Sequence, residues 1–239
     1  MCYHVSVHSP KDKLTKRFKA RIQDDELFSN PNFHVSGFSH RKLPVITEEQ
    51  PDLIQGYNWG LIPFFMKDIA SAKQSRIHCL NAKSETIFEK PSFRAPIMKR
   101  RCLVLVDGFM EWRDVNKNKY PHYIYLKEKE PFALGGIYDK WVDKETGENF
   151  NTFSIITTEA NPMMAAIHNS KLRMPLILDR TVEQAWLKEN NTKEDLINYM
   201  QPFDENKMAF NTISKLITSR KENTNVEKVL EPFEYHELN

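Results

Sequence analysis

The second residue of the chain, Cys2, could carry two nucleophiles on adjacent carbons. Cysteine is small enough for initiator methionine to be removed before it, so we expect a mature chain that begins at Cys2. Its thiol and α-amine have ordinary pKa values of about 8.5 and about 8. With an aldehyde the amine can form a Schiff base, and the thiol can then close onto the imine carbon to give a five-membered thiazolidine. A buried strand cysteine without a chemical role remains the alternative at this position.

Three other polar residues stand where they could assist such chemistry: Asn81, Glu111 and His168. Asn81 follows a predicted strand. The neighbours of Glu111, Met110 and Trp112, would desolvate its carboxyl group and raise its pKa, as a general acid or base near neutral pH requires. His168 ends a predicted helix, whose dipole favours the charged imidazolium. Each residue also has a structural interpretation: a turn residue, a surface carboxylate and a helix cap, respectively.

The charge distribution is uneven although the net charge is only +2. Residues 73–101 contain eight Lys and Arg against two Asp and Glu. Such a stretch is typical of a solvated face, and it could also contact an anionic polymer. His4 and His8 share a strand face but lie about 13 Å apart at about 3.3 Å per residue, too far to bind one metal ion. We therefore expect neither a metal nor a cofactor.

The composition is that of a folded globular protein. The chain has 239 residues, 40% of them apolar, and contains no low-complexity tract. No apolar run approaches the roughly 18 residues of a membrane helix, and no secretory signal is present. Three cysteines without metal-ligand spacing indicate a reducing compartment. We expect a monomeric cytoplasmic protein that does not bind membranes and is nucleoid-associated if bacterial.

Hydrophobic periodicity and turn signals predict many short strands and few helices. The expected strands are 2–8, 55–62, 77–82, 102–106, 120–127, 132–141, 150–157, 172–178 and 208–214. Helices are expected after Ser9-Pro10, over 84–90, from Asn161-Pro162 to His168, and after Thr181 and Thr192. Residues 30–51 and 107–112 are predicted to be turns.

Short connections favour antiparallel pairing, and neither a βαβ alternation nor a phosphate-binding glycine motif is present. The fold class that we predict is α+β: a single domain with a barrel-like, mostly antiparallel β-sheet and surrounding helices. The predicted domain covers 1–222, and 223–239 forms a C-terminal tail.

Taken together, four motifs make the chain resemble the SOS-response-associated peptidase (SRAP) family. They are Met1-Cys2, Asn81-Ala82-Lys83-Ser84-Glu85-Thr86, Asp107-Gly108-Phe109-Met110-Glu111-Trp112, and His168 followed by Arg173-Met174-Pro175. The Trp-Gly element at Trp59 also matches, and the resemblance runs from residue 1 to about residue 220. It departs from the family in having His4 where an arginine is usual, and four residues between His168 and Arg173 where one or two are usual.

The resemblance implies a DNA-damage response protein that recognises abasic sites in single-stranded DNA. Cys2 would form a thiazolidine cross-link with the ring-opened sugar, a lyase-type chemistry. Asn81 would orient the sugar, Glu111 would shuttle protons, and His168 would assist ring opening and release. The family name records a peptidase activity, for which ordinary removal of Met1 would suffice in this chain. The expected DNA contacts are His4, Trp59, Lys83, Trp112 and Arg173.

Two other functions use the same features. A cysteine hydrolase would use Cys2 as thiolate and His168 as base, with Glu111 or Asn81 orienting the histidine. A single-strand-binding module without catalysis would not need Cys2 at all.

Overall fold

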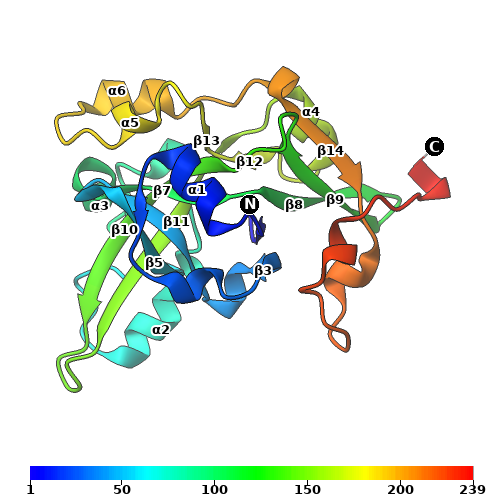
Figure 1. Cartoon of the computed structure of the whole chain (residues 1–239). Helices are drawn as coiled ribbons and strands as arrows, with labels where there is room; N and C mark the ends of the chain where they lie inside the picture. Colours follow the sequence, from blue (N-terminus) through cyan, green and yellow to red (C-terminus); the bar gives the residue numbers. More distant parts are fainter. Residues whose placement is uncertain (239) are drawn as a thin grey trace.

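The computed structural model describes residues 1–238, and its centre is a closed β-barrel (Figure 1). Five strands form the ring: β4 (Lys42–Thr47), β5 (Gln50–Trp59), β7 (Arg101–Val106), β10 (Phe132–Val142) and β11 (Asn149–Glu159). The ring closes because β11 pairs with β10 on one side and, in parallel, with β5 on the other. All other neighbours in the ring are antiparallel. The predicted α+β fold with a barrel-like, mostly antiparallel sheet is therefore confirmed.

Four short strands extend the barrel: β2 (Arg21–Ile22), β6 (Asn81–Lys83), β12 (Arg173–Pro175) and β13 (Ile177–Leu178). Both β6 and β12 pair with the end of β11. As a result, two of the motifs singled out in the sequence lie along the same strand of the barrel.

A second, antiparallel sheet lies beside the barrel in the order β14, β9, β8, β1, β3. Its strands are β14 (Met208–Thr212), β9 (Asn118–Leu126), β8 (Gly108–Val115), β1 (His4–Val7) and β3 (Asn32–Ser36). Only Asp107 separates β7 of the barrel from β8 of this sheet. The N-terminal strand β1 pairs with both β8 and β3, which places the chain start centrally in Figure 1.

Short helices surround the two sheets: α1 (Lys11–Phe18), α2 (Ile69–His78), α3 (Arg94–Lys99), α4 (Pro162–Ile167), α5 (Glu183–Trp186) and α6 (Lys193–Tyr199). In Figure 1, α5 and α6 lie at the top and α2 at the bottom. The predicted caps Asn161 and Thr192 are confirmed, because each accepts a hydrogen bond from a backbone N–H three residues on. Thr181 is not a cap, since α5 begins after Val182.

The β7 strand is buried on both faces, which explains its unbroken apolar sequence. Val104 and Val106 belong to one hydrophobic cluster, together with Cys2, while Leu103 and Leu105 belong to another. Cys2, the second residue of the chain, is thus part of the protein core.

The sequence predictions were wrong in four regions. The helix predicted over 84–90 is only a 3₁₀ helix over Ser84–Thr86. Residues 30–51 form β3 and β4 instead of turns. Pro44 is tolerated in β4 because pairing with β7 begins only at Val45. The strand predicted over 77–82 is the end of α2 followed by β6; Asp68 caps this helix by accepting from the Ser71 N–H. The turn predicted over 107–112 is largely β8.

The described part of the predicted C-terminal tail, residues 223–238, packs against the second sheet. Its Val229 is fully buried beside Met110, Ile213 and Ile217. The last residue of the predicted tail, Asn239, lies outside the described residues. Within residues 1–238, none of the helices has the length and apolarity needed to span a membrane.

Candidate functional site

The α-amine at the start of the chain lies between two buried side chains. The Met1 nitrogen is 3.4 Å from His168 Nε2 and 3.9 Å from Glu111 Oε1. Glu111 Oε2 is in turn 3.7 Å from His168 Nε2. These three groups line one side of a pocket of about 620 Å³, whose wall also includes His4, Lys83, Trp112 and Arg173. The structure therefore brings the N-terminus, a carboxyl group and an imidazole together in one cavity.

Strand pairing positions Glu111 beside the N-terminus. Val5 of β1 pairs with Phe109 of β8, and alternation along β8 puts Phe109 and Glu111 on the same face. The side chain of Glu111 is only 5% exposed, and its Oε1 atom has no hydrogen-bond partner. Burial raises the pKa of Glu111 to about 8, although the Met1 amine lowers it in part. The carboxyl group is therefore mostly protonated at pH 7 and can act as a general acid.

His168 presents a lone pair to the N-terminal amine. Its Nδ1 is 2.8 Å from the carbonyl oxygen of Arg173, and since a carbonyl can only accept, Nδ1 must be the donor. In the neutral ring, Nε2 is then an acceptor facing the Met1 nitrogen. Burial, and next the charge of that amine, lowers the pKa of His168. The expectation that the helix dipole favours the imidazolium was therefore wrong, because burial outweighs the dipole of the short helix α4.

The extra residues between His168 and Arg173 do not displace the histidine. The backbone N–H groups of Lys171 and Leu172 both donate to the His168 carbonyl. Leu172 adopts the left-handed conformation, with φ of 53°, and its side chain is 55% exposed. The insertion therefore forms a tight outward turn that returns Arg173 to the ring of His168.

Cys2 is buried close to Glu111, and Asn81 is buried as well, although neither residue lines the pocket. Burial, and next the carboxyl group of Glu111, raises the pKa of the Cys2 thiol well above its ordinary value, so the thiol is protonated. Its Sγ lies 3.9 Å from the carbonyl oxygen of His4. Asn81 is 8% exposed, and both polar atoms of its side chain are buried without a partner. No hydrogen bond among the described residues joins Asn81 to Glu111 or His168.

One of the expected DNA contacts, Trp59, needs correction. Trp59 is fully buried, stacks on Phe153 and donates its Nε1–H to the carbonyl of Leu80 at 2.9 Å, so it cannot stack on a nucleobase. His4 lines the pocket but does not supply charge. Burial, followed by the neighbouring His34 ring, lowers the pKa of His4 to about 3.

The other three expected contacts, Lys83, Trp112 and Arg173, lie in the pocket wall. Lys83 is exposed, and the edge of the Trp112 ring system contacts His4 at a ring-centroid distance of 4.8 Å. Both terminal nitrogens of Arg173 donate to the carboxylate of Glu85, and one also donates to the carbonyl of Thr157 at 2.6 Å. The charge of Arg173 is therefore paired within the protein.

Sequence reasoning missed six further residues in this wall: Tyr3, Asp114, Lys119, Ser170, Lys171 and Thr218. Lys119 comes from β9, Lys171 from the insertion, and Thr218 from the 3₁₀ turn after β14. No local motif marks them, because only the folded chain brings these elements to one pocket.

Comparisons with known proteins show the family of the chain. The family model described as SOS response associated peptidase (SRAP) matches residues 1–220. The chain belongs to the SRAP family. The abasic site processing protein YoqW of Bacillus subtilis is 34% identical over 226 residues, which cover 94% of this chain and 97% of that protein. The abasic site processing protein HMCES of Rattus norvegicus is 30% identical over 273 residues, covering 94% of this chain and 74% of that protein.

A solved structure from Bacteroides thetaiotaomicron has the same fold as this SRAP protein. It superposes with a TM-score of 0.91 at 39% sequence identity, and the match covers 97% of this chain and 100% of that one. The barrel with its attached sheet is thus shared with a relative whose structure was determined by X-ray crystallography.

Proposed function

We propose that this SRAP protein processes abasic sites in single-stranded DNA and forms a covalent thiazolidine cross-link through Cys2 once Met1 has been removed. The observation that carries the proposal is the position of the chain start, whose amine lies within 4 Å of both Glu111 and His168. Removal of Met1 would transfer the terminal amine to Cys2, next to the thiol. The names of the relatives support abasic sites as the substrate.

The first stage of the reaction joins the Cys2 amine to the aldehyde carbon of the ring-opened sugar. The neutral Nε2 of His168 can accept the proton that the amine loses as the C–N bond forms. That proton passes to the former carbonyl oxygen, which becomes the hydroxyl group of a carbinolamine. Protonated Glu111 can then give its proton to this hydroxyl group, which leaves as water, and the remaining N–H proton returns to Glu111. The product of this stage is an imine between Cys2 and the sugar.

The second stage closes the ring. The thiol sulfur of Cys2 adds to the imine carbon, and its proton passes to the imine nitrogen, a transfer that Glu111 can mediate. In total, one aldehyde and one N-terminal cysteine give one thiazolidine and one water. No thiolate has to accumulate before the imine forms, which is compatible with the raised pKa of the buried thiol.

The pocket wall suits a single DNA strand. Lys83, Lys119 and Lys171 can contact phosphates, and Trp112 offers an aromatic surface for a base. Arg173 could contact a phosphate only by exchanging its bond to Glu85. Asn81, whose amide is unpartnered, would orient the sugar.

A cysteine hydrolase remains the second candidate because Cys2 and His168 would serve both reactions. Its chemistry needs a thiolate activated by the imidazole. The pKa of the thiol is raised by burial, and no hydrogen bond among the described residues joins it to His168. Both observations favour the cross-linking reaction.

The test is the intact mass of the processed protein before and after incubation with a single-stranded oligonucleotide that contains one abasic site. We expect loss of Met1 and a heat-stable adduct. Cys2→Ala, retained Met1 or an acetylated Cys2 amine should each abolish it. Cys79→Ala, which removes another buried thiol, is the matched control and should keep it. A processed chain that gives no adduct would refute the proposal. A peptidase activity that survives acetylation would favour the hydrolase, and full function in Cys2→Ala would indicate a binding module.

A further inference from the structure

A chain of hydrogen bonds links the pocket to the C-terminal segment. His4 Nδ1 is 2.8 Å from His34 Nε2, and His34 Nδ1 is 2.8 Å from Thr224 Oγ1. The backbone N–H of His34 also donates to the side-chain oxygen of Asn225 at 3.2 Å. His4 forms part of the pocket wall, whereas Thr224 lies at the far end of this chain of contacts.

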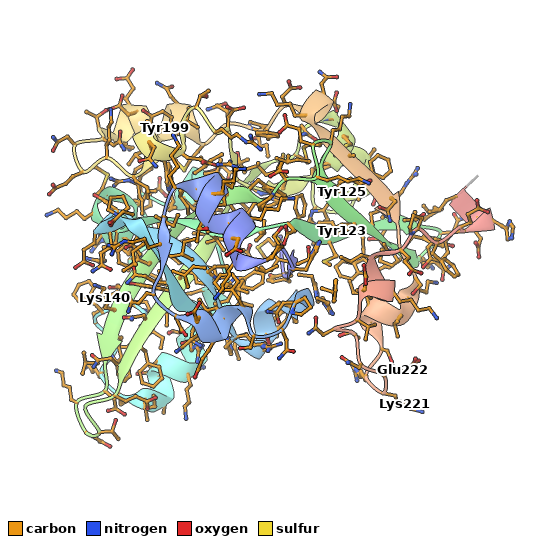
Figure 2. All side chains as sticks on the ribbon, viewed as in Figure 1. Tyr123, Tyr125, Lys140, Tyr199, Lys221 and Glu222 are labelled. Atoms are coloured by element: carbon orange, nitrogen blue, oxygen red, sulfur yellow. The ribbon has the colours of Figure 1, made fainter. Side chains whose placement is uncertain are left out.

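The segment that supplies Thr224 lies beyond residue 220, where the match to the SRAP family model ends. It turns at an exposed tip formed by Lys221 and Glu222 (Figure 2) and then returns to the protein. A few residues later it is anchored by Val229, which is fully buried. Thr224 therefore contacts His34 from a segment that the buried side chain of Val229 holds against the protein.

The two imidazoles must hold matched tautomers. A neutral imidazole has one donor and one acceptor nitrogen, so a hydrogen bond between two neutral rings needs N–H on one and a lone pair on the other. Burial lowers the pKa of His34 to about 4 and that of His4 to about 3, so both rings are neutral at pH 7. The bond between the rings couples their tautomers, so whether the Thr224 hydroxyl donates to His34 Nδ1 or accepts from it is linked to the tautomer of both rings.

One of the two arrangements suits DNA. If the Thr224 hydroxyl donates to His34 Nδ1, then His34 Nε2–H donates to His4 Nδ1, and His4 carries its proton on Nε2. His4 then offers an N–H to the pocket. Phosphate and sugar-ring oxygens can accept such a bond, whereas a lone pair on His4 would repel them.

We propose that His34 and Thr224 are positioning residues that fix the orientation and the tautomer of His4, so that His4 donates a hydrogen bond to the DNA strand in the pocket. The inference rests on the proposed function for its substrate. It assigns to the C-terminal segment, which the family model does not cover, a role in the site. Because His4 contacts the ring of Trp112, the same bonds also hold one side of the proposed stacking surface.

The kinetic test compares three variants in the rate of adduct formation with a single-stranded abasic oligonucleotide, at DNA concentrations below and above saturation. Thr224→Val removes the hydroxyl group and should raise the half-saturating DNA concentration roughly fivefold, the effect of one lost neutral hydrogen bond. Thr224→Ser should restore it. Thr212→Val is the matched control: it removes a 2.7 Å bond to the carbonyl of Phe233 that anchors the same segment but touches neither histidine.

A second measurement keeps this inference separate from the proposed function. Side-chain ¹⁵N NMR of the free protein reports the tautomer of each histidine without DNA. We expect His4 protonated on Nε2 in the parent and in Thr224→Ser and Thr212→Val, and a mixed signal in Thr224→Val. An unchanged His4 signal in Thr224→Val overturns the inference, as does an equal kinetic loss in Thr224→Val and Thr212→Val. A parent that shows the expected tautomers but forms no adduct refutes the proposed function and leaves the hydrogen-bond chain established.

Discussion

Replacing Glu111 by Gln should stabilise the protein at neutral pH while it impairs the reaction. The carboxyl group of Glu111 is buried, and burial raises its pKa from 4.5 to about 8. The folded protein therefore keeps this proton up to about pH 8, whereas the unfolded chain releases it near pH 4.5. Unfolding releases a proton between these two values, so the folded state loses stability as the pH rises.

The size of the effect follows from the pKa shift. The raised pKa of Glu111 costs about 3 kcal/mol of folding free energy at pH 7 but less than about 1 kcal/mol at pH 5. Gln has nearly the same size and cannot ionise. The stability of Glu111→Gln relative to the parent should therefore be higher at pH 7 than at pH 5 by about 2–3 kcal/mol, or roughly 5–10 °C in Tm for a domain of this size.

Urea unfolding of both proteins at pH 5 and pH 7, in the same N-terminal state, measures this difference. His4 and His34 also change their charge on unfolding in this range, but they do so in both proteins and cancel. The groups that face Glu111, the N-terminal amine and His168, are the same in both. Glu145→Gln, an exposed carboxylate in the turn between β10 and β11, is the control and should give no pH-dependent gain. An equal stability difference at the two pH values would refute the raised pKa of Glu111. The reaction rate of Glu111→Gln should fall by about 10²- to 10⁴-fold, the usual range for loss of a general acid.

Other residues give simpler expectations. Trp59→Phe should lower stability in urea unfolding by about 2 kcal/mol, because it leaves a cavity in the core and removes one of the two hydrogen bonds that the carbonyl of Leu80 accepts, yet it should leave DNA affinity unchanged. Trp112→Ala should weaken binding to single-stranded abasic DNA by about 1 kcal/mol or more in fluorescence anisotropy, since a base loses its stacking surface. Leu172→Gly should raise Tm, because glycine relieves about 1 kcal/mol of left-handed strain at an exposed side chain. Asn161→Ala should lower stability by about 1–2 kcal/mol through loss of the cap of α4, measured by the same unfolding assay.

Local signals were sufficient for part of the site. Asn161-Pro162 marks the start of α4 because an asparagine cap and a proline at the first helical position act within a few residues, and the end of that helix carries His168. The apolar neighbours of Glu111 likewise indicate its burial. The prediction of a barrel-like sheet followed from the number of short strands and their short connections.

Other features depend on contacts between distant parts of the chain. Strand periodicity indicates that one face of β5 is buried. Only the closed barrel shows that the side chain of Trp59 lies in the barrel interior. The bond between His34 and Thr224 joins residues far apart in sequence, so neither residue stands out beforehand. The neutral state of His4 likewise depends on the fold, because burial, and next the His34 ring, lowers its pKa.

The one-residue connection between β7 and β8 has a consequence for ligand binding. The barrel strand is packed on both faces, and a single residue, Asp107, separates it from the strand that carries Glu111. The backbone N–H groups of His8 and Ser9 both donate to the Asp107 carboxylate, so this junction also fixes the end of the N-terminal strand. A scaffold that is already ordered in this way loses little conformational entropy when a ligand binds. We therefore expect the single-stranded DNA of the proposed function to change its shape on binding, while β8 keeps its position.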